Sequence, residues 1–216
     1  TVNPPAEPAF AREVLAGNET PAYAGRSSPD YWDRFRSLLT KEVNATIAGA
    51  RAAGGRSFVV NEGHGGNLFA NIIPFDLDSS AMLVRGFPKP LVMITGLDST
   101  FGTIMFTGAH GAPGSGGVMA HNFAFDALIA GEMGVSVSLV SGDDALIAET
   151  RQILGKDFVE IITKRAIGHS AAITYSPTKV RAMLKAGAAQ AVRKELAGGI
   201  KPFTMAALGV MFFQYL

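Results

Sequence analysis

The sequence predicts an α/β fold, with a largely parallel sheet flanked by helices and a metal site at the carboxyl ends of its strands. Short apolar runs of strand length alternate along the chain with longer segments of helical periodicity. This order builds parallel strand–helix–strand units. Histidines closely follow two of the apolar runs, at His64 and His110. Ligands of open parallel sheets bind beyond the carboxyl ends of the strands, so we expect both histidines at one edge of the sheet.

The composition limits the classes of protein that fit. The chain has 216 residues, of which 48% are hydrophobic and 17% charged, enough for one substantial core. We expect one α/β domain over residues 1–204, followed by an apolar segment, residues 205–216, that forms its last helix. The net charge of +1, without any basic cluster, argues against nucleic-acid binding. Because cysteine is absent, disulfides and thiolate zinc sites are excluded.

The hydropathy pattern argues against a membrane partner. No apolar run approaches the roughly 20 residues that span a bilayer. The first residues show neither the basic region nor the apolar core of a signal peptide. A cytoplasmic location is therefore the default expectation.

The first half of the chain has clear helix and turn signals. Residues 1–27 hold four prolines and are predicted to be an extended arm. Ser28 is the expected cap of a helix that runs to about Ala53, with Pro29 in its first turn and Gly54 at its end. The buried stripe of this helix is predicted from apolar residues at helical spacing: Phe35, Leu38, Leu39, Val43 and Ile47. The next expected elements are a strand at 57–60, a helix at 67–73, a strand at 81–84 and a helical turn within 88–96.

The second half repeats the alternation of strands and helices. The turn 141–144 supplies acids that cap a helix ending at Leu154, and Ser176-Pro177 opens a long helix that stops before Gly198. The other expected elements are a strand at 103–107, a helix at 126–133, a strand at 135–140 and a strand at 158–163.

A glycine-rich loop, residues 108–117, separates His110 from His121. It has neither the Lys-Ser/Thr of a phosphate-binding loop nor the spacing of a dinucleotide fingerprint. Neutral imidazole is the commonest protein ligand of transition metals, so His64 and His110 can share a metal centre. Spacing alone leaves open that each is a loop histidine bonded to backbone, and that His121 packs under the glycine loop.

Several motifs in order along the chain resemble one known family. They are Lys41-Glu-Val-Asn44, Val60-Asn-Glu-Gly-His64, Gly96-Leu-Asp-Ser-Thr-Phe101, Thr107-Gly-Ala-His110, Gly117-Val-Met-Ala-His121, Val140-Ser-Gly-Asp-Asp144 and Ser176-Pro177. Together they resemble the zinc-dependent D-aminopeptidases of the bacterial dipeptide-transport type. The similarity extends from about Asp30 to Thr204.

The resemblance implies a metallo-aminopeptidase that removes the N-terminal residue from short peptides, with a preference for D-amino acids in the best-known members. It implies two zinc ions, with His64 and His110 among the ligands and His121 as the catalytic residue. Metal-activated water or His121 itself would attack the scissile carbonyl. Manganese and cobalt also suit histidine and carboxylate ligands. Family members assemble as homo-oligomeric rings.

Two carboxylate motifs of the family have no match here. The family opens with a strand carrying Asp-x-Glu-Gly, and a glutamate ligand normally precedes the helix that begins here at Asp126. Glu132, in Gly-Glu-Met-Gly, lies too close to residues 142–144 to take that role. We expect the carboxylate ligands in stretches outside the printed sequence. If they are lacking, the alternative is a non-catalytic ring-forming scaffold that binds peptide or metal; a third possibility is an amidohydrolase acting on non-peptide amides.

Other polar residues near the histidines allow two interpretations each. Asp143 and Asp144 are a carboxylate pair for acid–base work, or a helix cap with a second acid in the first turn. Glu62 orients the neighbouring histidine, or is an exposed loop acid. Asn61 donates a hydrogen bond to a substrate carbonyl, or has no role at the site.

Overall fold

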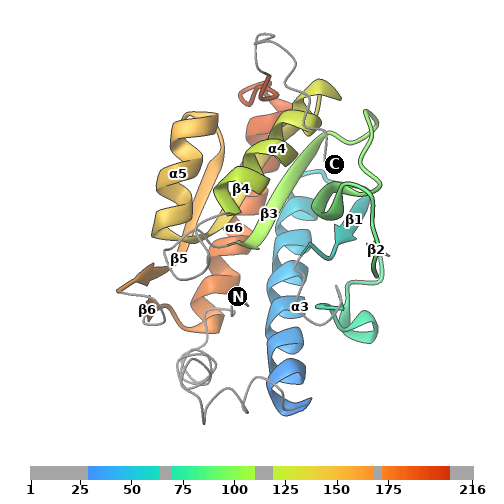
Figure 1. Cartoon of the computed structure of the whole chain (residues 1–216), viewed down its shortest axis with the longest axis vertical. Helices are drawn as coiled ribbons and strands as arrows, with labels where there is room; N and C mark the ends of the chain where they lie inside the picture. Colours follow the sequence, from blue (N-terminus) through green and yellow to red (C-terminus); the bar gives the residue numbers. More distant parts are fainter. Residues whose placement is uncertain (1–28, 64–69, 110–118, 168–171, 205–216) are drawn as a thin grey trace, which may run out of the picture.

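The computed structural model describes residues 29–63, 70–109, 119–167 and 172–204 (Figure 1). The helices are α3 (Pro29–Ala52), α4 (Met119–Glu132), α5 (Asp144–Leu154) and α6 (Pro177–Leu196), with short 3-10 turns η2 (Pro74–Asp76) and η3 (Val92–Ile94). The strands are β1 (Phe58–Asn61), β2 (Ala81–Val84), β3 (Thr103–Ala109), β4 (Ser136–Asp143), β5 (Val159–Ala166) and β6 (Ala172–Thr174).

The strands form two sheets within the described part of the chain. One has the order β3-β4-β5-β6, and the other pairs β1 with β2. All neighbouring strands run parallel except β5 and β6, which are antiparallel. The predicted α/β class with a largely parallel sheet is therefore confirmed. The sequence did not predict β6, because three residues are too short for a period of two to be recognised.

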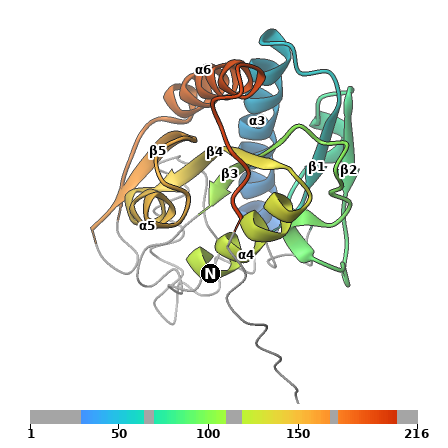
Figure 2. The same cartoon turned by 90° about the horizontal axis from the view of Figure 1, so that it is seen from above.

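Helices cover both faces of the four-stranded sheet. Figure 2 shows α3 and α6 on one side and α4 and α5 on the other. Successive strand residues point to opposite faces, so Leu139 of β4 packs against α6 while Val140 packs against α5. Every residue of β4 is buried, which makes this strand the centre of the core.

The contact between α3 and α6 depends on a glycine. A Cβ atom built on Gly49 would lie 2.0 Å from the carbonyl oxygen of Lys185 on α6. No real Cβ atom comes this close to backbone, so only glycine lets the two helices approach to this distance.

Two predicted helices, α5 and α6, are confirmed together with their caps. The Asp143 Oδ1 atom accepts a hydrogen bond from the Leu146 amide at 2.8 Å and caps α5. Ser176 caps α6 by accepting from the Lys179 amide at 3.4 Å. The long first helix ends at Ala52, one residue before its expected end.

Two predicted helices need correction. Of the helix expected at 67–73, residues 70–73 are not helical, and residues 67–69 lie outside the described residues. Side chains bind this backbone instead: the Ile72 amide donates to Glu62 and the Ile73 amide donates to Thr40. The helix expected at 126–133 in fact begins at Met119, because residues 119–125 contain no glycine or proline to break it.

The strands of the main sheet also extend further than predicted. Strands β3, β4 and β5 continue to Ala109, Asp143 and Ala166. The added residues are polar, glycine or alanine, and they lie beyond the apolar runs from which the strands were predicted. The apolar segment 205–216 lies outside the described residues, so its place in the domain stays a prediction. No helix in the described part of the chain is long and apolar enough to cross a membrane.

Candidate functional site

The carboxyl ends of β3, β4 and β5 meet at one edge of the sheet because the three strands are parallel. Ala109, the last residue of β3, pairs with Gly142 of β4. A Cβ atom on Gly142 would lie 2.3 Å from the Ala109 carbonyl oxygen, so glycine is required for this close approach. The residue that follows Ala109 is His110. His110 therefore directly follows a strand end at the predicted edge of the sheet.

The histidines themselves are placed only in part. His64 and His110 lie outside the described residues, so their roles as metal ligands stay predictions. The backbone of His121 lies in the first turn of α4, on the face of the sheet opposite α3, while its side chain is outside the described part. The structure therefore brings the strand end that precedes His110 to the predicted edge, but does not test the contact among the three histidines.

Asp143 caps a helix at this edge. Its side chain is buried, and the hydrogen bond to the Leu146 amide occupies Oδ1. Asp144 follows in the first turn of α5, where an acid interacts favourably with the helix dipole. The helix-cap interpretation of this pair is confirmed.

A buried lysine that the sequence analysis did not identify lies beside the cap. Lys164 is the register partner of Asp143 on β5, and its side chain is buried. Burial lowers the pKa of Lys164 to about 8, although the negative charges of Asp143 and Glu42 act in the opposite direction. Glu42 is buried as well and comes from α3. The edge therefore holds a buried group of two carboxylates and one amine.

Glu42 could have been found from helical periodicity. It lies on the same face of α3 as the buried residues Phe35, Leu38 and Thr46. The Thr46 Oγ1 atom lies 3.4 Å from the Thr107 Oγ1 atom, so this face of α3 covers the end of β3. An acid at such a position is buried against the sheet edge rather than solvated.

At the end of β1, both carboxylate oxygens of Glu62 accept hydrogen bonds from other parts of the fold. Its side chain is 0% exposed, which shows that the exposed-acid interpretation was wrong. The Arg85 guanidinium donates to both carboxylate oxygens at 2.7 Å, from Nε to Oε2 and from Nη2 to Oε1. The Ile72 amide also donates to Oε1, at 2.6 Å. The hydrogen bonds to Arg85 raise the pKa of the guanidinium.

Asn61 is engaged within the protein. Its Oδ1 atom accepts from the Lys89 Nζ atom at 2.5 Å, and its Nδ2 atom donates to the Thr95 carbonyl at 2.9 Å. Lys89 also donates to the Glu62 carbonyl at 2.5 Å. These bonds give the Asn61 side chain a structural role, so the structure offers no support for the proposed contact with a substrate carbonyl.

The described residues alone do not fit a zinc site. No three histidine, aspartate or glutamate side chains among them lie close enough together to hold a metal ion. The carboxylate of Glu62 is bound by Arg85, and Asp143 caps α5. A zinc ion usually has four ligands, and His64 with His110 would supply two of them. The remaining ligands would have to come from outside the described residues.

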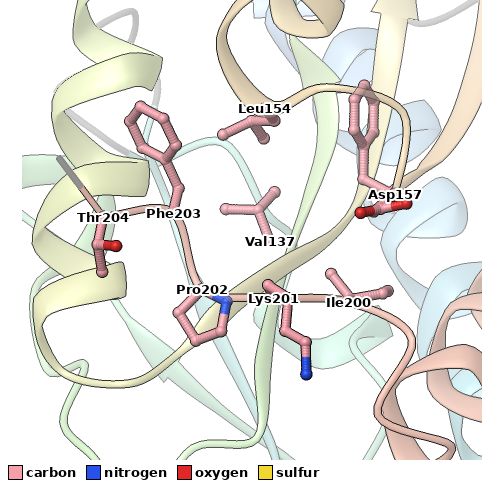
Figure 3. Close-up of a pocket in the computed structure, with 9 residues that line it drawn as sticks. Val137, Leu154, Asp157, Ile200, Lys201, Pro202, Phe203 and Thr204 are labelled. Atoms are coloured by element: carbon pink, nitrogen blue, oxygen red, sulfur yellow. The ribbon is translucent and has the colours of Figure 1, made fainter. Parts of the chain in front are cut away.

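A small cavity lies at the opposite edge of the sheet. It has a volume of about 180 Å³ and is lined by residues 200–204 together with Val137, Leu154, Asp157 and Phe158 (Figure 3). Val137 and Phe158 lie at the amino ends of β4 and β5. The cavity is therefore separated from the carboxyl edge by the length of the strands and is not the candidate site.

The fold is a largely parallel α/β sheet, and the ordered motifs point to the class of metal-dependent peptidases. Residues 15–212 match the family model of peptidase M55, the D-aminopeptidases, and the chain belongs to this family. A D-aminopeptidase of Bacillus subtilis strain 168 is 30% identical over 190 residues, which cover 80% of this chain and 68% of the relative.

A solved structure agrees with this assignment. The Zn-dependent D-aminopeptidase DppA from Bacillus subtilis, a self-compartmentalizing protease, superposes with a TM-score of 0.70 at 26% sequence identity. The similarity covers 81% of this chain and 68% of that structure. The predicted family and enzyme class, a metallopeptidase of the D-aminopeptidase type, are confirmed.

Proposed function

We propose that this chain releases N-terminal amino acids, D-residues in preference to L-residues, from short peptides in a zinc-dependent reaction. The match to the D-aminopeptidase family over residues 15–212 carries the proposal. The parallel strands support it because they bring the strand end before His110 to the edge where such sheets bind ligands.

The zinc site would include His64 and His110, with two ions as the resemblance implies and further ligands from outside the described residues. Manganese or cobalt could occupy the same ligands. When bound, zinc would supply a Lewis acid that polarises a carbonyl oxygen and lowers the pKa of water. The zinc dependence of the similar Bacillus subtilis protein supports the choice of metal.

His121 would be the catalytic residue, acting as a nucleophile or as a general acid–base group at the scissile bond. Its backbone lies in the first turn of α4, which begins directly after the glycine-containing segment that follows His110. An imidazole titrates near neutral pH, so it can hold or release a proton under working conditions.

The chain would act as a homo-oligomeric ring. The self-compartmentalizing assembly of the similar protease supports this, and so do large apolar side chains exposed around β2. Phe75 is 99% exposed, and Met82 and Phe87 are exposed nearby in the sequence. An apolar patch formed by such side chains would suit a subunit contact. Light scattering coupled to gel filtration would give the number of subunits.

The deciding experiment uses the purified full chain loaded with zinc. D-alanine and L-alanine para-nitroanilides and a simple non-peptide amide are assayed in parallel, with zinc content measured by elemental analysis. Faster hydrolysis of the D-alanine substrate supports the proposal. Bound zinc without hydrolysis of any substrate would favour the ring-forming scaffold, and hydrolysis of the simple amide alone would favour an amidohydrolase.

A further inference from the structure

We propose that the Glu62–Arg85 ion pair is a positioning device that fixes both ends of residues 63–71, the segment that carries His64. The effect on zinc binding rests on the proposed function, whereas the effect on the two ends of the segment does not. Glu62 and Arg85 would act through the position of His64 and need not touch the substrate.

The contacts of Glu62 fix the start of this segment. Its amide donates to the Val84 carbonyl at 3.2 Å, which extends the pairing of β1 with β2 by one residue. Its carbonyl accepts from the Lys89 Nζ atom at 2.5 Å. Both backbone groups of the residue before Gly63 are therefore bound to other parts of the fold.

The same ion pair fixes the end of the segment. The Ile72 amide donates to the Glu62 carboxylate at 2.6 Å, and the Ile72 carbonyl accepts from the Arg85 guanidinium. The two backbone groups of Ile72 are thus held by the two partners of one ion pair. Glu62 and Ile72 are ten residues apart in the chain and are joined through this carboxylate.

The energetics favour a positioning role for this pair over a large contribution to stability. Glu62 is 0% exposed and Arg85 is 30% exposed, so both groups lose much of their hydration. The net stability of a buried ion pair is small, because the cost of desolvation offsets most of the attraction between the charges. The planar guanidinium binds a carboxylate in one fixed orientation, which sets the positions of the groups it joins.

The chain contains a control pair of the same geometry that is more exposed, with Arg151 at 48% and Glu160 at 21%. Arg151 donates from Nε to the Glu160 Oε1 atom at 2.6 Å and from Nη2 to the Oε2 atom. This pair has the same two-bond geometry and joins α5 to β5. Glu160 lies near the amino end of β5, away from the carboxyl edge. The Arg151–Glu160 pair therefore shares the chemistry of Glu62–Arg85 without bracketing a histidine.

The experiment compares Glu62→Gln and Arg85→Lys with Glu160→Gln, each in the full chain. Hydrogen exchange of the peptide containing Ile72 is followed by mass spectrometry in the metal-free protein. Zinc affinity is measured by competition with a chromophoric chelator, and the melting temperature reports overall stability. Arg85→Lys keeps the charge but loses the two-bond geometry, so it remains informative if Glu62→Gln does not fold.

We expect faster exchange at Ile72 and weaker zinc binding in Glu62→Gln than in wild type, because the segment that carries His64 would lose the contact that fixes its end. Arg85→Lys should fall between Glu62→Gln and wild type. Glu160→Gln should alter neither exchange at Ile72 nor zinc affinity. Exchange at Ile72 that is unchanged in both Glu62→Gln and Arg85→Lys would overturn the inference.

The metal measurements separate the two proposals. If the wild-type chain binds no zinc, the proposed function fails, and exchange at Ile72 alone decides whether the ion pair fixes the segment. If the wild type binds zinc with the same affinity as Glu62→Gln, the pair does not position His64 and the inference fails. An equal loss of zinc affinity in Glu160→Gln would also overturn it, because the effect would then be general destabilisation.

Discussion

Asp143 and Lys164 lie opposite each other on β4 and β5, and both side chains are buried at the carboxyl edge of the sheet. Asp143 also caps α5, so one carboxylate joins a helix terminus to a buried amine. Such an arrangement connects the stability of this edge to the protonation of Lys164.

Lys164→Met should remove a pH dependence of stability. Burial lowers the pKa of Lys164 from 10.5 to about 8, so between these values the unfolded chain binds more protons than the folded chain. Wild-type stability therefore gains a contribution as pH rises from about 8 to about 10.5, and the variant lacks it. Urea unfolding across this range would measure the difference, with Lys156→Met as the exposed control. If the free energy of unfolding changed with pH equally in wild type and Lys164→Met, the lowered pKa of Lys164 would be contradicted.

Asp126→Asn should stabilise the protein at alkaline pH. Burial in α4 raises the pKa of Asp126 to about 7, and its Oδ2 atom has no hydrogen-bond partner within the described residues. The stability provided by the neutral acid is present below about pH 3.8 and is lost as pH rises through about 7. The variant should gain at most about 4 kcal/mol at pH 8 and little at pH 4. The exposed Asp33→Asn is the control, and an equal gain at both pH values would contradict the prediction.

Gly49→Ala should destabilise the contact between α3 and α6. The new methyl group would meet the Lys185 carbonyl, which belongs to backbone and cannot rotate away. Overpacking of this kind costs about 1 to 3 kcal/mol, more than the gain of about 1 kcal/mol in helix propensity. Chemical denaturation would measure the change. A variant more stable than wild type would show that the helices do not approach this closely.

His121→Ala should abolish peptidase turnover while leaving the zinc content unchanged. A positioned acid–base group contributes about 100- to 10,000-fold to the rate, so residual activity should be low. Steady-state assays with the D-alanine substrate and elemental analysis on the same sample would test both parts. Full activity would exclude the catalytic role.

His64→Ala and His110→Ala should instead lower the zinc content first. A chelator should inactivate the wild-type enzyme, and added zinc should restore it, because the proposed reaction needs the metal. Elemental analysis after dialysis against the chelator would follow the loss. Zinc retained at the wild-type level in both variants would place the metal elsewhere.

The helices show how much local sequence can predict. Ser176 and Gly198 bracket α6, and Asp143 caps α5, so each boundary depends on residues within a few positions of it. The start of α4 was missed because no local signal marks Met119. The helix predicted over residues 70–73 was wrong, because distant side chains take the backbone groups that a helix would need.

The candidate site was likewise predicted only in part from the sequence. The sequence identified His64, His110 and His121 through their motifs, and the family match confirms the class of enzyme to which those motifs point. It did not reveal the burial of Glu62 or the group formed by Glu42, Asp143 and Lys164. The partners in these groups come from separate strands and helices, which have no fixed spacing along the chain.

Local patterns were enough to predict the α/β class, the caps that bound the helices and the motifs of a D-aminopeptidase, because each pattern lies in residues close together along the chain. Which charged groups are buried, and what they bind, depends on how distant segments pack. In the sequence Glu62 is an acid two residues before a histidine, and it becomes the partner of Arg85 and Ile72 only when β1 pairs with β2. The burial of a charge depends on what packs around it, and packing brings together residues that the chain keeps apart.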